Sequence, residues 1–207
     1  MLRRSTIILA LTTIAFVARG GIDFTPTASE FIGEGIKYQK LIFKNDKQLV
    51  EYYPPPGWTF LGNAERVQLR PPQKSFAEAV IESTPLAAPQ PLDEKITKAL
   101  TERFVSTLPA GSQFVTVVSE EQNPVPLNGR PTFEVTVSYQ LMGEKFLKSA
   151  LYANLPDTQL VFRLAAKKDD FAPLHTEFRR SVFSWHWIEA EQRHSEVAKD
   201  AGQTAAR

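Results

Sequence analysis

Apolar and polar residues alternate most regularly between Phe133 and Leu141. Every odd-numbered position in this stretch is apolar, and the even-numbered positions from 132 to 140 carry Thr, Glu, Ser or Gln. A period of two predicts a β-strand with one buried face and one face in water.

Two turn sequences follow this strand, Met-Gly-Glu-Lys at 142–145 and Leu-Pro-Asp-Thr at 155–158. They predict two more strands, 146–153 and 159–166, and therefore a three-stranded antiparallel meander. Earlier strand candidates are rich in Val, Ile, Phe or Tyr and are bounded by Pro, Gly or Asn; they are 36–43, 49–53, 66–70, 77–82 and 113–119. We expect a sheet of about six to eight strands.

Two segments have helical spacing instead. In the first, Ile96, Leu100 and Phe104 recur every four residues, and Asp93 is placed to cap the start. The second begins at the Asp pair 169–170 and carries an apolar stripe of Phe171, Leu174, Phe178, Val182 and Trp185. The order of elements predicts an α+β fold, in which an antiparallel sheet packs with two main helices in a sandwich.

The first twenty residues are typical of a secretion signal. An Arg pair near the start precedes an apolar run at 7–17, which is too short to span a membrane. Ala18 and Gly20 are small residues at positions −3 and −1 relative to a possible cleavage site. We expect cleavage between Gly20 and Gly21. The mature protein would then be periplasmic or secreted, with no membrane span.

Composition and charge narrow the range of partners. The 207 residues are 43% hydrophobic and carry a formal net charge of +1, so no long-range field favours nucleic acid. The absence of cysteine excludes disulfides and acylation of a cysteine at the signal cleavage site. We divide the chain into a signal peptide (1–20), a lead-in (21–35), a single domain (36–188) and a polar tail that is flexible or a helical extension (189–207).

One segment and the order of elements resemble a known family. A predicted strand runs from Glu51 into Pro54-Pro55-Pro56-Gly57-Trp58. The last segment with a regular hydrophobic pattern is a predicted helix rich in aromatic residues. This resembles the PsbP-like superfamily, over roughly residues 36–187. The resemblance implies an accessory role, since the family includes extrinsic subunits of photosystem II, a Ran-binding transport factor and exported bacterial proteins. No functional residue is carried over from those members.

The chain lacks the contiguous motifs of nucleophilic hydrolases, nucleotide-binding loops, zinc proteases and calcium loops. Catalytic groups can still converge from distant positions, and the three histidines, His175, His186 and His194, are the natural candidates. We therefore assign no catalytic, cofactor-binding or metal-ligating residue, and we expect no cofactor.

The candidate ligand or partner surface consists of Trp58, Trp185, His186 and Trp187. Each residue also has a structural interpretation. His186 is expected to pack at the end of a helix and to form a hydrogen bond with a terminal carbonyl. Trp58 is expected to lie in the core, where a rigid turn of the preceding prolines places it. The alternative is that the prolines form a polyproline ligand.

His175 and Glu177, with Arg179 and Arg180, are interpreted as a solvated helix surface. The Asp pair 169–170 is interpreted as a helix start and not as a cation site.

Two functions remain open from the sequence. The first is an exported, non-catalytic binding or accessory domain whose partner is an envelope protein or a small apolar ligand. The second is a periplasmic hydrolase or lyase with dispersed catalytic residues. A groove lined by apolar and aromatic side chains would favour the first, and a convergent Ser, His and carboxylate the second.

Overall fold

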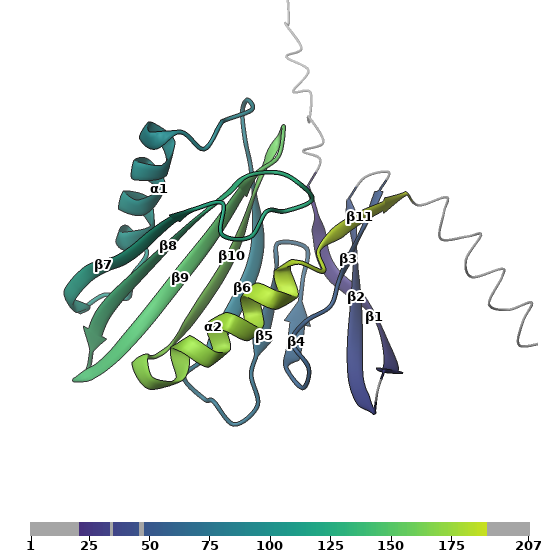
Figure 1. The fold of residues 1–207 in the computed structure, drawn as a ribbon, viewed down its shortest axis with the longest axis horizontal. Helices are drawn as coiled ribbons and strands as arrows, with labels where there is room; N and C mark the ends of the chain where they lie inside the picture. The colour runs from purple at the N-terminus through teal and green to yellow at the C-terminus, as the bar shows by residue number, and fades with distance from the viewer. Residues whose placement is uncertain (1–20, 34, 46–47, 190–207) are drawn as a thin grey trace, which may run out of the picture.

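The structure is a computed structural model that describes residues 21–33, 35–45 and 48–189. Two antiparallel sheets and two helices make up the described part of the chain (Figure 1). In chain order the elements are β1 (Asp23–Gly33), β2 (Ile36–Asn45), β3 (Gln48–Tyr52), β4 (Thr59–Gly62), β5 (Arg66–Arg70), β6 (Glu78–Pro85), α1 (Glu94–Ser106), β7 (Gln113–Gln122), β8 (Thr132–Leu141), β9 (Glu144–Asn154), β10 (Thr158–Lys167), α2 (Lys168–Val182) and β11 (His186–Glu189).

The larger sheet has seven strands in the order β4-β5-β6-β10-β9-β8-β7. The predicted meander is confirmed, because β8 pairs with β9 and β9 with β10, both antiparallel. The first hairpin turns at Met142 and Gly143, whose φ angles of 52° and 81° are those of a hairpin turn. The predicted helix cap is also confirmed, since the Asp93 side chain accepts from the Ile96 amide at 2.9 Å.

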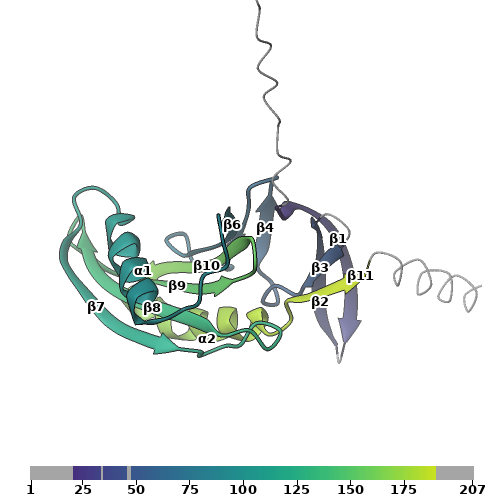
Figure 2. The same ribbon diagram turned by 90° about the horizontal axis from the view of Figure 1, so that it is seen from above.

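The expectation that β8 has one face in water is wrong. Its odd-numbered residues pack under α1, where Val135 and Val137 contact Leu100 and Phe104 in one core cluster. Its even-numbered residues lie on the opposite face, under α2, and Thr136 is buried there. The view from above shows the two helices on opposite faces of the curved sheet (Figure 2). A period of two shows that the polar side chains share one face of the strand. It does not show whether that face is exposed, because a second helix can cover it.

The smaller sheet has the order β1-β2-β3-β11 and contains two strands that the sequence analysis missed. The segment 21–35, expected to be a lead-in, holds the whole of β1, which pairs with β2 from Asp23 to Gly33. The second helix was expected to extend through Trp185; it ends at Val182, and residues 186–189 form β11 against β3. Trp185 therefore lies in the connection between a helix and a strand.

The α+β fold class is confirmed, with the strands divided between two sheets. The main core cluster lies between the smaller sheet, the larger sheet and α2, and includes Phe24, Phe43, Trp58, Phe178 and Trp185. No helix in the described residues is both long and apolar enough to cross a membrane. Residues 1–20 and 190–207 are outside the described part, so the signal and tail predictions are untested there.

Candidate functional site

Trp58 is part of the core, as its structural interpretation predicted. Its side chain is 2% exposed and stacks on Phe178, with ring centroids 6.2 Å apart. The proline segment turns the chain into it, because the Trp58 amide donates to the Pro55 carbonyl at 3.2 Å and Gly57 has a φ of 79°. The indole Nε1 donates to Glu177 at 3.2 Å. Glu177 is thus engaged and not simply solvated.

Trp185 joins the two sheets. It is 1% exposed and packs against the rings of Phe24, Phe43, Tyr52 and Phe162. Its carbonyl accepts from the side-chain amide Nδ2 of Asn128 at 3.1 Å, which fixes the loop of residues 128–130 beside it. With so little exposed surface, Trp58 and Trp185 are core residues, and Trp185 packs against Trp187 of the candidate surface.

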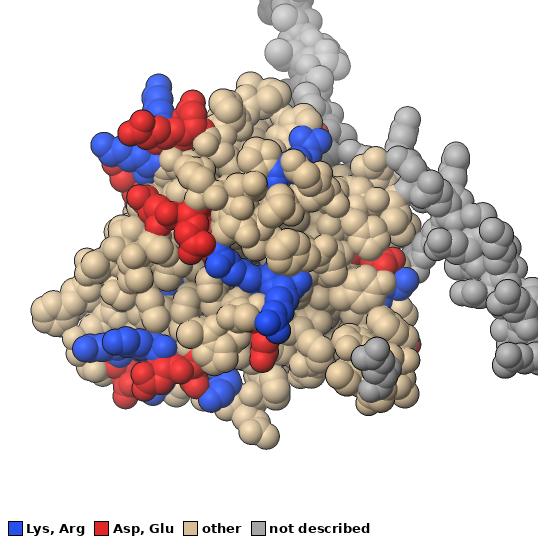
Figure 3. All heavy atoms as spheres, in the orientation of Figure 1, with Lys and Arg blue, Asp and Glu red and all other residues tan. Residues whose placement is uncertain are grey.

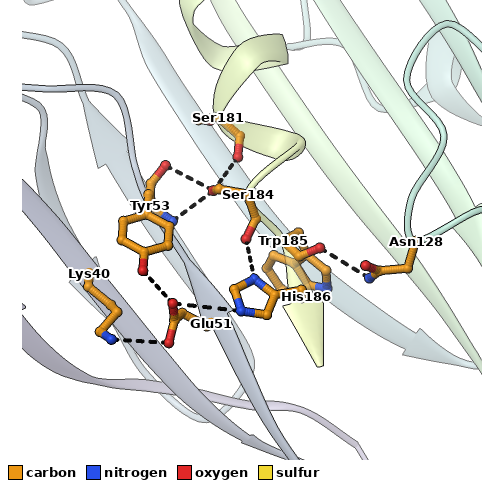
Figure 4. Close-up of polar contacts among 8 residues, drawn as sticks. All are labelled: Lys40, Glu51, Tyr53, Asn128, Ser181, Ser184, Trp185 and His186. Carbon is orange, nitrogen blue, oxygen red and sulfur yellow. Dashed lines mark hydrogen bonds and ion pairs between the residues drawn. The ribbon is translucent and has the colours of Figure 1, made fainter. Parts of the chain in front are cut away.

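His186 lies at the start of β11, and both of its ring nitrogens have neighbours (Figure 4). Nδ1 is 2.9 Å from the Ser184 carbonyl, so this nitrogen carries the proton and donates. Nε2 is 3.7 Å from an oxygen of Glu51 on β3. The predicted hydrogen bond from His186 to a carbonyl near a helix end is confirmed. His186 itself belongs to a strand and not to the helix.

Glu51 is the centre of the polar cluster around His186. Its carboxylate is 3.2 Å from the Lys40 ammonium and accepts from the Tyr53 hydroxyl. Partial burial, together with the hydrogen bond and the negative charge of Glu51, raises the pKa of Tyr53 to about 12. Tyr53 therefore stays protonated and donates to Glu51 throughout the physiological pH range.

A serine, a histidine and a carboxylate do come close here, but not in the arrangement of a catalytic triad. The Ser184 hydroxyl accepts from the Tyr53 amide at 2.9 Å and donates to the Ser181 carbonyl at 2.6 Å. The imidazole of His186 contacts the Ser184 carbonyl and not the hydroxyl. A triad requires the histidine to take the hydroxyl proton, so this cluster is not set up for acyl transfer. It instead fixes the connection between α2 and β11 against β3 and Tyr53.

The fourth predicted residue, Trp187, borders a groove of about 1090 Å³ where the ends of the two sheets meet. We call it the Trp187 groove. Its apolar lining includes Ile22 and Leu155, and its polar lining includes Arg130 and Asp157, which are both exposed. Trp187 packs edge-on to Trp185, with ring centroids 6.3 Å apart. The roles of His186 and Trp187 in binding stay predictions.

A second polar cluster was missed by the sequence analysis. Glu134 on β8 is 3% exposed; its two oxygens lie 2.6 Å from His175 Nε2 and 2.6 Å from Arg179 Nη2. Arg179 also bonds Glu121 of β7 at 2.7 Å. Burial lowers the pKa of Arg179, but the two carboxylates outweigh it and raise the pKa. His175 and Arg179 are therefore not a solvated surface.

The i, i+4 spacing of His175 and Arg179 was the available signal for this cluster, because it places both side chains on one face of α2. The partner of both side chains, Glu134, lies on the polar face of β8. The cluster ties α2 to the larger sheet, and Glu134, His175 and Arg179 do not line the Trp187 groove.

The comparisons with known proteins support the fold. No family model and no curated protein matches the sequence. The solution structure of cyanobacterial PsbP (CyanoP) from Synechocystis sp. PCC 6803 is similar, with a TM-score of 0.51 at 13% identity, over 86% of this chain and 99% of that one. The fold is therefore PsbP-like. At this identity the similarity concerns the fold alone.

Proposed function

We propose that this protein is an exported, non-catalytic accessory domain that binds a segment of an envelope protein in the Trp187 groove. The observation that carries the proposal is the groove itself, which has an apolar lining of Ile22, Leu155 and Trp187 and exposed charges on Arg130 and Asp157. Apolar contacts surrounded by polar and charged groups are characteristic of protein interfaces.

The size of the groove favours a protein segment over a small molecule. About 1090 Å³ slightly exceeds the range of about 300–1,000 Å³ that is usual for small-molecule pockets. Arg130 forms no ion pair with any described residue, so its charge is available to a partner. Asp157 presents the opposite charge on the β9–β10 turn, which would fix the orientation of a bound segment.

The geometry around His186 also favours binding over the alternative hydrolase or lyase. The Ser184 hydroxyl is committed to backbone groups, and the two nitrogens of His186 face a carbonyl and a carboxylate. This cluster supports the wall of the groove through Trp185 and Trp187. Export is proposed from the signal sequence, with a mature chain that begins at Gly21.

Site-specific photo-crosslinking in intact cells tests this proposal. A photoreactive residue at position 156, an exposed and uncharged position that lines the groove, should give a discrete crosslinked product in the envelope fraction, and intact mass should show a chain starting at Gly21. The matched control places the same residue at Lys98, an exposed position on α1. Arg130→Glu/Asp157→Lys should remove the product at position 156. The same products at both positions, or a product unaffected by Arg130→Glu/Asp157→Lys, would refute the groove as the binding site.

A further inference from the structure

A second groove lies along the β7 edge of the larger sheet, and the proposed function does not use it. Its volume is about 550 Å³, within the usual range for small-molecule pockets. We call it the β7 groove. Its lining residues include the apolar Phe114, Val118 and Leu147 and the cationic Lys145 and Lys168.

Phe114 is in an unfavourable conformation at this groove. Its φ of 50° is in the left-handed region, which a bulky aromatic residue rarely adopts. Its side chain is 78% exposed, so burial in this chain does not compensate for the strain. Strained residues of this kind cluster at ligand-binding sites, where the surrounding structure holds a side chain in position. The strained backbone of Phe114 places an exposed aromatic residue at the groove.

The two lysines provide charge without an internal partner. Neither Lys145 nor Lys168 forms an ion pair with a described residue, whereas the neighbouring Lys167 pairs with Glu144 at 3.2 Å. Asp169 follows Lys168 but does not line the groove. Figure 3 shows Lys or Arg atoms over the start of α2 with Asp or Glu atoms directly beside them, and a wide area without charged atoms next to both. The groove therefore combines apolar walls with two available positive charges.

The backbone of β7 argues against addition of another strand at this edge. Its pairing with β8 shifts register between Gln113 and Thr116 and again between Val117 and Ser119. Irregularities of this kind bend an edge strand and interrupt the regular row of hydrogen-bonding groups that a second strand would need. Recognition in this groove must then depend on side chains.

We propose that the β7 groove binds a single-chain fatty acid, with its alkyl chain against Phe114, Val118 and Leu147 and its carboxylate at Lys145 and Lys168. The charge complementarity selects a carboxylate head, and the apolar walls select an alkyl tail. The site is independent of the Trp187 groove, so failure of one proposal leaves the other standing.

Calorimetric titration of the full-length protein with decanoate, below its micelle concentration, tests the site. Decanoate should bind at least about tenfold more tightly than decanol, because only the carboxylate pairs with the lysines. Lys145→Glu/Lys168→Glu should weaken decanoate binding at least about tenfold. Lys95→Glu/Lys98→Glu, the same charge change at exposed positions of α1, should leave it unchanged.

Glycine substitutions separate the aromatic contact from the backbone strain. Phe114→Gly relieves the left-handed strain and removes the ring, so it should weaken decanoate binding at least about fivefold. Met142→Gly is the control, because Met142 has a φ of 52°, is 96% exposed and does not line the groove. It should bind decanoate as the native protein does.

Three results would overturn the proposal: no decanoate binding, equal binding of decanol, or equal effects of the groove and α1 charge variants. Sedimentation provides a further check. A dimer of the native protein that Phe114→Gly dissociates would assign this surface to a second copy of the chain and not to a fatty acid.

Discussion

Glu134 is a carboxylate in the interior, and its environment determines how α2 sits on the sheet. His175 and Arg179 each approach one of its oxygens at 2.6 Å, from consecutive turns of the same helix. A buried carboxylate without such partners would cost several kcal/mol. The network therefore couples the position of α2 to β8, and through Glu121 to β7.

Removing Arg179 should destabilise the protein more than removing its neighbour. Arg179→Met leaves one oxygen of Glu134 without a cation, and we expect a loss of about 2–3 kcal/mol in the free energy of unfolding. Arg180→Met, at an exposed position one residue along α2, should cost about 0.5 kcal/mol or less. Urea unfolding midpoints at constant m-value measure both. Equal losses would mean that the Glu134 network does not stabilise α2.

Single residues were predictable where local chemistry decides their role. The Asp93 cap and the core position of Trp58 depend on neighbours in sequence, and both were recovered. Glu134 was predicted to be exposed to solvent. The alternation of polar and apolar residues in β8 shows which side chains share a face, but it does not show what covers that face. His175 was misassigned for the same reason, since its partner lies 41 residues away.

β8 shows the same limit at the level of an element. It was assigned from its period of two, and its pairing partners were found from the turns that follow. The strands missed were β1, β4 and β11. β4 and β11 are four residues each, too short to show a period, and β1 carries Thr, Ser and Pro along a mostly exposed edge. Their positions are set by pairing with distant strands and not by local preference.

Both faces of β8 should be sensitive to a buried charge. Val135→Asp places a carboxylate under α1, and Thr136→Asp places one under α2 beside Glu134; we expect losses of about 3–5 and about 2–3 kcal/mol respectively. Thr116→Asp on β7 is the control, because Thr116 is exposed, and it should cost about 0.5 kcal/mol or less. Denaturant unfolding of the three variants decides the matter. A Thr136→Asp variant as stable as Thr116→Asp would show that α2 does not cover that face.

The whole molecule has two packed sheets that meet at Trp185, with the Trp187 groove where their ends adjoin. The sequence could indicate the α+β class and the tryptophans near the junction. It could not indicate the groove, because its lining comes from segments between Ile22 and Trp187 that only the folded chain brings together. For the same reason the sequence could not show whether Ser184, His186 and Glu51 are arranged as a triad, which required the placement of the Ser184 hydroxyl.

Complementation of a deletion strain tests most directly whether this protein binds through the Trp187 groove and does not catalyse a reaction at a histidine. Three variants are compared, each checked for folding by circular dichroism. His175→Gln/His186→Ala/His194→Ala removes every imidazole, with glutamine retained at 175 as a donor to Glu134. Arg130→Glu/Asp157→Lys reverses the charges at the groove. Lys98→Glu/Glu102→Lys makes the same exchange at exposed positions on α1.

The account predicts that the histidine variant and the α1 variant restore the native phenotype and that the groove variant does not. The folded histidine variant keeps the groove and loses every imidazole base or metal ligand. A folded histidine variant that fails to complement, together with a groove variant that succeeds, would contradict the account and point to histidine chemistry.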